Sequence, residues 1–232
     1  MSVSESIALG RRGLCVSTGT YSENWIYYPE KITSPEIVHE AVNFFLERDI
    51  SFMWPLYDDG DRKLLENAGL CYAGDLTAMS LTPRIAAPNN NVTFERVNDS
   101  LLWARTAWQG FGGSVDELPG EFVKFSAALN ADRKNFSLYL ARYEGEEAGT
   151  FLVTNEEKCA GVYYFAVMPE LRRKGIARAM MNEICRLSGG KSGGNKKKIL
   201  LQATPMGVPF YRAYGFDIIS KIPVYSTEED IF

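Results

Sequence analysis

The sequence contains few cysteines and almost no histidine, and neither residue type occurs in a metal-binding pattern. Its four cysteines are scattered singly, without a C-x-x-C spacing, and His39 is the one histidine among 232 residues. Structural zinc sites need four Cys or His ligands at close spacing. We therefore expect no structural metal site. Singly placed cysteines also favour a reduced, cytoplasmic setting.

Long hydrophobic runs and a strong excess of one charge are also missing. No stretch of 18 or more apolar residues occurs, and residues 1–12 carry a glutamate and two arginines where a signal peptide would be apolar. The net charge is -4, so there is no overall basic field to hold nucleic acid by its phosphates. We expect neither a membrane protein nor a nucleic-acid-binding protein.

The chain does contain enough hydrophobic residues for a substantial core, at 46% of the sequence, with 12% aromatic residues. Its periodic patterns break at residues 85–91, where proline and asparagine gather as in a linker. This break divides the chain into an N-terminal lobe, residues 1–84, and a C-terminal domain, residues 92–232. We expect the protein to fold alone, as a monomer or a homodimer.

The C-terminal domain has a regular alternation of strand and helix patterns. One strand precedes two helices, three closely spaced strands follow, and the chain ends with helix, strand, short helix and strand. Short connections between the three central strands predict an antiparallel meander. The expected strands cover 92–97, 136–143, 147–154, 159–167, 198–203 and 216–224. The expected helices cover 98–109, the region from 114 through 129, 172–188 and 208–213.

The segment from Val167 to Ala177 joins the last meander strand to the most clearly amphipathic helix. Unpaired backbone N–H groups at a helix start attract anions. Gly175 lets a phosphate approach the backbone, and Ala177 keeps the helix start slim. These features predict a diphosphate site, with positive charge added by Arg172, Arg173, Lys174 and Arg178.

Arg172-x-x-Gly175-x-Ala177 between a strand and a helix resembles the [RQ]-x-x-G-x-[GA] pyrophosphate loop of the GNAT acetyltransferase superfamily. Downstream, residues 211–216 resemble the Y-x-x-x-G-F signature of the same family. The resemblance extends over residues 92–224 and implies an α/β fold with a mixed sheet. In that fold the last meander strand splays from the next strand, and acyl-CoA lies in the gap. Arg173 departs from the family, which commonly has glycine there.

The resemblance also implies roles for individual residues. The Val167 N–H would polarise the acyl carbonyl, and Tyr211 would protonate the leaving thiolate of coenzyme A. The structural alternative for Tyr211 is packing in the core beside its aromatic neighbours. Main-chain groups of Ala166, Val167 and Met168 would pair with the pantetheine arm. The diphosphate would be held by Arg172, Arg173, Lys174, Gly175, Ile176, Ala177 and Arg178.

The function implied is N-acetyl transfer from acetyl-CoA to a primary amine, by direct attack in a ternary complex. The alternative is a catalytically silent acyl-CoA-binding or protein-interaction module. A nucleotide-binding module is disfavoured because G-x-x-x-x-G-K-[ST] is missing. The sequence does not identify the acceptor amine. Residues 196–198 either reach the adenosine 3′-phosphate or only increase solubility. The general base is not assigned, and the candidates are Asp116, Glu117, Glu121 and Glu147.

The N-terminal lobe resembles a degenerate partial copy of the same fold. Residues 52–81 repeat the order strand, proline turn, short helix, glycine and strand that is seen in 200–225, and an amphipathic helix at 35–47 precedes them. Residues 27–35 lack the R-x-x-G-x-A loop, and Leu65 stands where Tyr211 stands. We therefore predict one acyl-CoA site per chain. Three aromatic residues either line the acceptor cleft or belong to the core: Trp25, Trp54 and Tyr57.

Overall fold

The computed structural model describes residues 5–9, 13–17, 24–57, 62–84, 89–189 and 197–228. In this part of the chain, strands β1-β2-β3 form one sheet, and a larger mixed sheet has the hydrogen-bonded order β4-β11-β5-β10-β9-β8-β7-β6. The chain groups into two compact units. One comprises Met1–Ala78, Gln202–Tyr211 and Ile218–Phe232, and the other comprises Met79–Leu201 and Arg212–Asp217. Each unit is described separately below.

The unit around residues 79–201 contains most of the elements predicted for the C-terminal domain. Its helices are α3 (Ser100–Gly110), α4 (Gly120–Ala131) and α5 (Ile176–Ser188). Its strands are β6 (Val92–Arg96), β7 (Phe136–Tyr143), β8 (Glu146–Thr154) and β9 (Cys159–Val167), together with the start of β10 (Lys198–Ala203). The predicted antiparallel meander is confirmed by the pairing of β7 with β8 and of β8 with β9.

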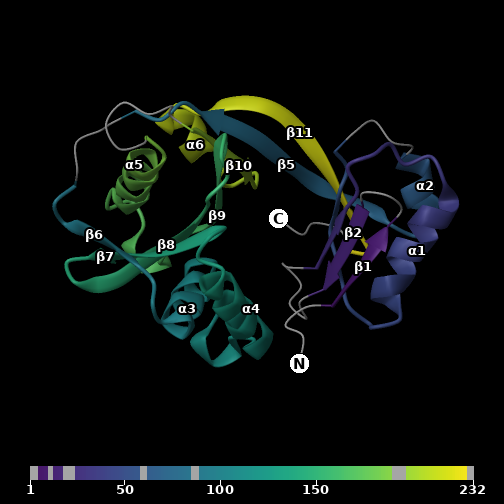
Figure 1. Cartoon of the computed structure of the whole chain (residues 1–232), viewed down its shortest axis with the longest axis horizontal. Coiled ribbons are helices and arrows are strands. Elements are labelled where there is room, and N and C mark those ends of the chain that lie inside the picture. Colours follow the sequence, from purple (N-terminus) through teal and green to yellow (C-terminus); the bar gives the residue numbers. More distant parts are fainter. Residues whose placement is uncertain are drawn as a thin grey trace. The chain divides into compact units, whose positions relative to one another are not determined.

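Helices cover both faces of this sheet. Figure 1 shows α3 and α4 on one side of β7, β8 and β9, with α5 on the other side. The α3 and α4 side has a core that includes Trp103, Phe122 and Leu152. On the α5 side, a Cβ atom added to Gly149 of β8 would lie 3.2 Å from the Met180 sulfur. Because both faces are covered, all six β8 residues from Ala148 to Val153 are buried.

Local sequence signals account for two of these helices. Asp99 caps α3, as predicted for residues 98–100, because its carboxylate accepts hydrogen bonds from the backbone N–H groups of Leu101 and Leu102. The buried side of α5 includes Ile176, Met180 and Ile184, which are spaced at helical intervals. The prediction that this helix covers 172–188 is wrong at its start, which lies four residues later.

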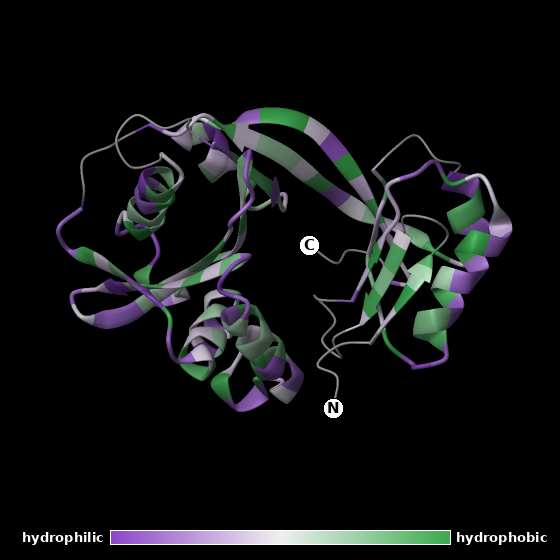
Figure 2. Ribbon diagram, in the orientation of Figure 1, coloured by the Kyte–Doolittle hydropathy of each residue, from purple (hydrophilic) through white to green (hydrophobic). Residues whose placement is uncertain are grey.

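The other compact unit begins with a small antiparallel sheet that the sequence did not predict. Its strands are β1 (Glu5–Leu9), β2 (Gly13–Ser17) and β3 (Trp25–Tyr27). Helix α1 (Pro35–Leu46) follows and buries hydrophobic residues that include Phe45. Figure 2 shows its hydrophobic residues interleaved with hydrophilic ones. The remaining elements are β4 (Trp54–Pro55), α2 (Arg62–Asn67), β5 (Cys71–Leu81) and most of β11 (Asp217–Ser226).

The order of elements in the N-terminal half repeats the order in the C-terminal half. Three antiparallel strands, a helix, a strand, a short helix and a strand occur as β1-β2-β3-α1-β4-α2-β5 and again as β7-β8-β9-α5-β10-α6-β11, where α6 spans Val208–Tyr214. Trp25 of β3 forms a parallel bridge with Met53, which directly precedes β4, and β9 likewise runs parallel to β10. The predicted N-terminal partial copy is therefore confirmed, and it extends further toward the N-terminus than residues 35–81.

The compact units are not consecutive along the chain. The segments Gln202–Tyr211 and Ile218–Phe232 group with the N-terminal residues. The limits expected for the linker and the two domains, 1–84, 85–91 and 92–232, stay a prediction. Residues 85–88 of that linker and Lys196 lie outside the described residues.

Cys15 gives the fold a testable alkaline sensitivity. Its side chain has no solvent exposure, and burial raises the pKa of its thiol from 9.0 to about 12. The unfolded chain therefore loses this proton at a lower pH than the folded chain, so the contribution to stability is complete below pH 9 and falls as the pH rises toward 12. Raising the pH from about 8 to about 10 should therefore lower the free energy of unfolding by about 1.4 kcal/mol through this thiol.

Urea unfolding of the parent protein and of Cys15→Val at these two pH values measures that contribution. Valine keeps the site apolar and close in volume, so the variant should lose less stability on alkalinisation, by about 1.4 kcal/mol. An equal loss in both proteins would show that Cys15 does not contribute.

Candidate functional site

The candidate site begins where β9 and β10 separate. The two strands pair in parallel over three residues, from Lys198 opposite Cys159 to Leu200 opposite Gly161. In the described residues their register extends no further, although β9 continues to Val167. Beyond Gly161, β9 therefore runs without pairing to β10 in the described residues. An extended ligand can hydrogen-bond to such a strand edge.

A β-bulge in β9 accompanies this separation. The register between β8 and β9 shifts between Thr150 and Leu152, so two β9 residues stand opposite Phe151. Tyr164 in the bulge has a φ of 49°, a left-handed conformation that is uncommon for an aromatic residue. The Thr150 hydroxyl donates to the Tyr164 carbonyl at 3.1 Å, and the Tyr164 ring packs at 5.3 Å from Trp103. Both contacts hold the bulge in place.

The Val167 backbone N–H points into the open side of β9. The next residue, Met168, donates its N–H to the Ala148 carbonyl of β8 at 2.9 Å. Successive N–H groups of a strand point in opposite directions. The Val167 N–H therefore points away from β8, toward the side where β10 diverges. The Ala166 carbonyl lies on the β8 side, because a Cβ atom added to Gly149 would meet it at 2.4 Å.

The loop after β9 turns sharply before α5 begins. A 3₁₀ turn covers Pro169–Leu171, and two later residues have left-handed backbone, Arg173 with a φ of 65° and Gly175 with a φ of 81°. Glycine adopts this conformation readily, whereas it costs an L-residue such as arginine about 1 kcal/mol. The Ala179 N–H makes an early helical bond, to the Gly175 carbonyl. The N–H groups of residues 176–178 thus lie at the helix start, where anions bind.

Arg172 contributes to this loop as a brace between chain segments. Its Nε donates to the Val167 carbonyl at 3.3 Å, and one terminal nitrogen donates to the Gly110 carbonyl at 2.9 Å. It therefore links the end of β9 to the end of α3. Gly110 also touches β9 closely, because an added Cβ atom would lie 2.7 Å from the Ala166 Cβ. The sequence indicated a charge at Arg172 and gave no signal for this contact with Gly110.

The other cations of the predicted site surround the loop. The Lys174 ammonium lies 5.5 Å from the centre of the Tyr143 ring, and the Arg178 guanidinium lies 5.6 Å from the centre of the Tyr214 ring. Arg173, Lys174 and Arg178 are exposed, and no carboxylate of the described residues forms an ion pair with them. They leave a positive surface beside the helix start.

Helix α6 carries the tyrosine that the motif singles out. Tyr211 is 9% exposed, and burial raises the pKa of its hydroxyl, which therefore stays protonated at neutral pH. Its ring packs at 5.2 Å from that of Phe210. Tyr214, three residues later, donates its hydroxyl hydrogen to Asn182 of α5 at 2.6 Å and lies 3.6 Å from the Cys185 sulfur. The hydroxyl of Tyr214 is thus engaged with α5.

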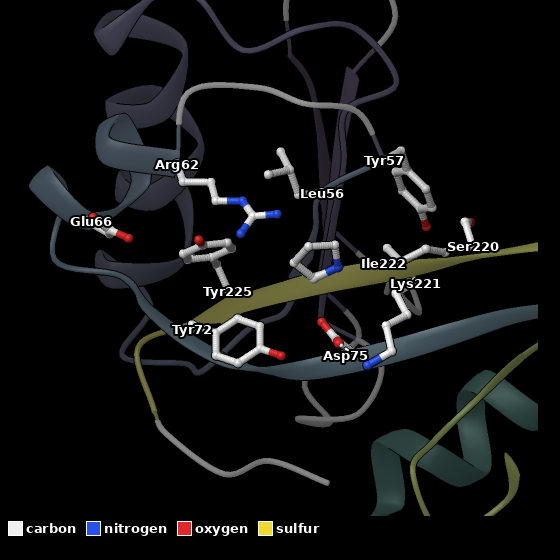
Figure 3. Close-up of a pocket in the computed structure, with 11 residues that line it drawn as sticks. Leu56, Tyr57, Arg62, Glu66, Tyr72, Asp75, Ser220, Lys221, Ile222 and Tyr225 are labelled. Atoms are coloured by element: carbon white, nitrogen blue, oxygen red, sulfur yellow. Dashed lines mark hydrogen bonds and ion pairs between the residues drawn. The ribbon is translucent and has the colours of Figure 1, made fainter.

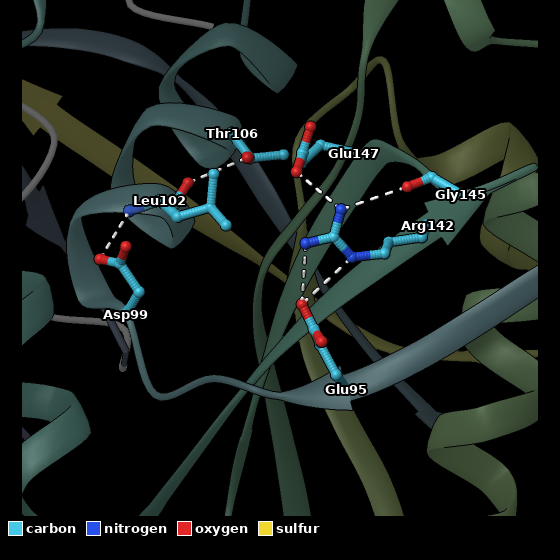
Figure 4. A network of polar contacts seen from close by, with 7 residues as sticks. All are labelled: Glu95, Asp99, Leu102, Thr106, Arg142, Gly145 and Glu147. Carbon is cyan, nitrogen blue, oxygen red and sulfur yellow. Dashed lines mark hydrogen bonds and ion pairs between the residues drawn. The ribbon is translucent and has the colours of Figure 1, made fainter.

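The carboxylates considered as general bases differ in their partners. Figure 4 shows Arg142 between Glu95 and Glu147, with the Arg142–Glu147 contact at 2.7 Å. The pKa of Glu147 is lowered by its own backbone N–H and by Arg142, which makes it a weaker base. Glu121 pairs with Lys124 at 2.8 Å, and Asp116 and Glu117 lie exposed in a 3₁₀ turn, Val115–Glu117. No single base stands out.

Two remaining sequence hypotheses can be placed. Trp54 has no solvent exposure and belongs to the hydrophobic core, whereas Trp25 is half-buried and Tyr57 is 38% exposed. Lys197 donates to the Glu156 carbonyl.

In the described residues, no group of three or more His, Cys, Asp or Glu side chains has an arrangement that could hold a metal ion. None of the described helices has the length and hydrophobicity needed to span a bilayer.

Comparison with known proteins identifies the region that contains this site. Residues 134–218 match the model of the acetyltransferase (GNAT) domain. A search of curated protein sequences gave no match.

Solved structures with the same fold cover almost the whole chain. A GCN5-related N-acetyltransferase from Kribbella flavida has a TM-score of 0.64 at 13% identity, over 96% of this chain and 89% of that one. One from Sphaerobacter thermophilus has a TM-score of 0.64 at 14% identity, over 97% and 84%. A tandem GNAT protein from the clavulanic acid biosynthesis pathway has a TM-score of 0.61 at 10% identity, over 92% and 77%. At these identities the likeness concerns the fold, and the predicted GNAT-like fold is confirmed.

Proposed function

We propose that this chain transfers an acetyl group from acetyl-CoA to a primary amine, because residues 134–218 match the model of the acetyltransferase (GNAT) domain. The observation that carries the proposal is the open edge of β9 with the Val167 N–H directed into it. An N–H held in this position stabilises negative charge on an acyl oxygen without having to reorient.

The cofactor would bind along β9 and at the start of α5. Main-chain groups of residues 166–168 would pair with the amides of the pantetheine arm, as an added strand does. The diphosphate would lie at the N–H groups of residues 176–178, close to Gly175, where the backbone has no side chain in the way. Arg173, Lys174 and Arg178 supply the surrounding positive charge, and Arg172 holds the loop against Val167 and Gly110.

The reaction would proceed by direct attack, without a covalent enzyme intermediate. The amine nitrogen forms a bond to the thioester carbonyl carbon, and the Val167 N–H stabilises the oxyanion that develops. The carbon–sulfur bond then breaks, and the departing thiolate takes the proton of the Tyr211 hydroxyl. The proton lost by the attacking amine leaves through water or a carboxylate and balances the one donated by Tyr211. No step needs a metal ion.

Binding and turnover can be tested separately. Calorimetry with acetyl-CoA and with CoA should show saturable binding of one molecule per chain at micromolar concentration, and no binding of either would refute the proposal. Thiol release from acetyl-CoA should be measured with pools of polyamines, amino acids, aminoglycosides and peptides. Release that depends on one pool supports acyl transfer and identifies the acceptor class. Binding without release from any pool would favour the catalytically silent acyl-CoA-binding module.

A further inference from the structure

A cavity separate from the proposed acyl-CoA site lies within the compact unit that contains the N-terminal residues. It has a volume of about 810 Å³ and lies among the ends of β4, α2, β5 and β11 (Figure 3). All of its lining residues belong to that one unit, and none of them belongs to the proposed acyl-CoA site. Its volume falls within the range typical of small-molecule sites, about 300 to 1,000 Å³.

Tyrosine rings form much of the wall of this cavity. Tyr225 of β11 is 2% exposed, and its ring contacts that of Tyr72 of β5 edge to face at 6.2 Å. Tyr57, after β4, also lines the cavity, and its ring packs against Tyr27 at 5.6 Å. Tyr72 is 51% exposed and offers an apolar ring face to a planar ligand, whereas the almost fully buried Tyr225 supports it through the ring contact.

Two charged residues of the lining neutralise each other. The Lys221 ammonium lies 3.1 Å from the Asp75 carboxylate, and the Tyr72 hydroxyl also bonds to that carboxylate. Burial acts to raise the pKa of Asp75, but the hydrogen bonds from Tyr72 and Lys221, together with the charges of Lys221 and Arg62, outweigh burial and lower the pKa. Asp75 is therefore an anion with its partners already in place, and neither it nor Lys221 calls for a charged ligand.

Arg62 differs from this pair. Figure 3 shows its guanidinium projecting from α2 into the cavity, between Leu56 and Tyr225. Arg62 is exposed, no carboxylate of the described residues forms an ion pair with it, and its charge acts on Tyr72, Asp75 and Tyr225. Glu66, on the same helix, also lines the cavity and lies at its edge in Figure 3. The cavity thus combines aromatic walls with one inward-pointing guanidinium.

We propose that this cavity binds a small aromatic monocarboxylate, with the carboxylate on the Arg62 guanidinium and the ring against Tyr72. A planar guanidinium binds a carboxylate through two parallel N–H bonds. Of the two cations in the lining, Lys221 is paired with Asp75, so the single guanidinium of Arg62 suits a monocarboxylate better than a diphosphate. The proposal does not depend on acyl transfer, because the two sites share no residue.

The probe for this site is phenylacetate, with its neutral analogue phenylacetamide, on the full chain. Saturation-transfer NMR titrations should give a Kd of about 1 mM for phenylacetate, as expected for a ligand of ten non-hydrogen atoms. Arg62→Met keeps the apolar stem and removes the donors, so it should weaken phenylacetate binding at least about 10-fold. Phenylacetamide should bind the parent protein at least about 10-fold more weakly than phenylacetate does.

Lys63→Met is the matched control, because it removes the same charge from the neighbouring residue of α2, which does not line the cavity. It should leave phenylacetate binding unchanged. Saturating CoA should also leave the phenylacetate signal unchanged, and acetyl-CoA should bind Arg62→Met as it binds the parent. Displacement by CoA, equal losses in both variants, or no saturable phenylacetate binding would each overturn the proposal, while leaving the acyl-CoA site to its own test.

Discussion

Replacing Tyr211 with phenylalanine should lower kcat for acyl transfer by about 100-fold while the Kd of acetyl-CoA changes by less than about 2-fold. General acids contribute about 100- to 10,000-fold to catalysed proton transfers. Phenylalanine keeps the ring that packs against Phe210 and removes only the hydroxyl. The effect therefore falls on the step in which the carbon–sulfur bond breaks and spares the binding of the cofactor.

Tyr214→Phe is the control that separates this role from a general loss of a buried hydroxyl. Tyr214 lies on the same helix, and its hydroxyl bonds to Asn182. We expect Tyr214→Phe to keep kcat within about 3-fold and to lose stability instead, by about 1 kcal/mol. Steady-state kinetics with the acceptor found by thiol release, together with calorimetry, measures both variants. An unchanged kcat in Tyr211→Phe, or the same fall in both, would remove the acid assignment.

The pH dependence of the reaction offers a further reading of Tyr211. Because burial raises the pKa of Tyr211 above the ordinary value of 10.0, its proton is present throughout the neutral range and beyond pH 10. Between about pH 7 and about pH 10, the kcat of the parent protein should therefore not fall through loss of the Tyr211 proton. The pH profile of Tyr211→Phe should have the same shape over this range. A tyrosine whose hydroxyl titrated in this window would produce such a fall.

Much of the C-terminal fold was predictable because its signals are local. The strands at 136–143, 159–167 and 198–203 coincide with the predicted ranges, since each has a hydrophobic run bounded by turn residues. The predicted start of α5 was wrong because the preceding turn depends on the left-handed backbone of Arg173. An arginine in the sequence does not predict that conformation. Strands β1, β2 and β3 were missed because short strands give little periodicity.

The candidate site was predictable only in part, for the same reason. The loop and the tyrosine signature are contiguous motifs, so Gly175 and Tyr211 could be named from the sequence. The bulge at Tyr164 and the contact between Arg172 and Gly110 join residues that are distant along the chain. The grouping of 218–232 with the N-terminal residues is likewise a non-local pairing, which a single sequence does not encode in any one window.

Arg172 should prove far more important than its neighbour Arg173, although both carry the same charge. Replacing Arg172 with methionine removes the donors to the Val167 and Gly110 carbonyls. Hydrogen bonds from charged donors contribute about 1.5 to 3 kcal/mol each where they are shielded from water, and less when exposed. We expect kcat/KM for acetyl-CoA to fall about 100-fold, with a part of the loss in kcat, because the peptide that carries the Val167 N–H is no longer held.

Arg173→Met is the matched variant, and salt distinguishes the two roles. Arg173 is exposed and, in the proposed site, would act on the diphosphate only through its charge, so its loss should weaken acetyl-CoA binding by about 10-fold or less. That difference from the parent should shrink in about 0.5 M NaCl, because added salt screens exposed charges. The deficit of Arg172→Met should persist at the same salt concentration, since it arises from lost hydrogen bonds between fixed segments.

Arg172→Lys sharpens the assignment. Lysine restores the charge, but its single ammonium lacks the planar fork that reaches the carbonyls of β9 and α3 together. It should therefore recover less than about a tenth of the lost kcat/KM. Full recovery by lysine, or equal losses in Arg172→Met and Arg173→Met that both vanish in salt, would mean that Arg172 acts as a phosphate-directed charge. In that case the β8 pairing, the Thr150–Tyr164 contact and the packing of Tyr164 on Trp103 are enough to hold the end of β9.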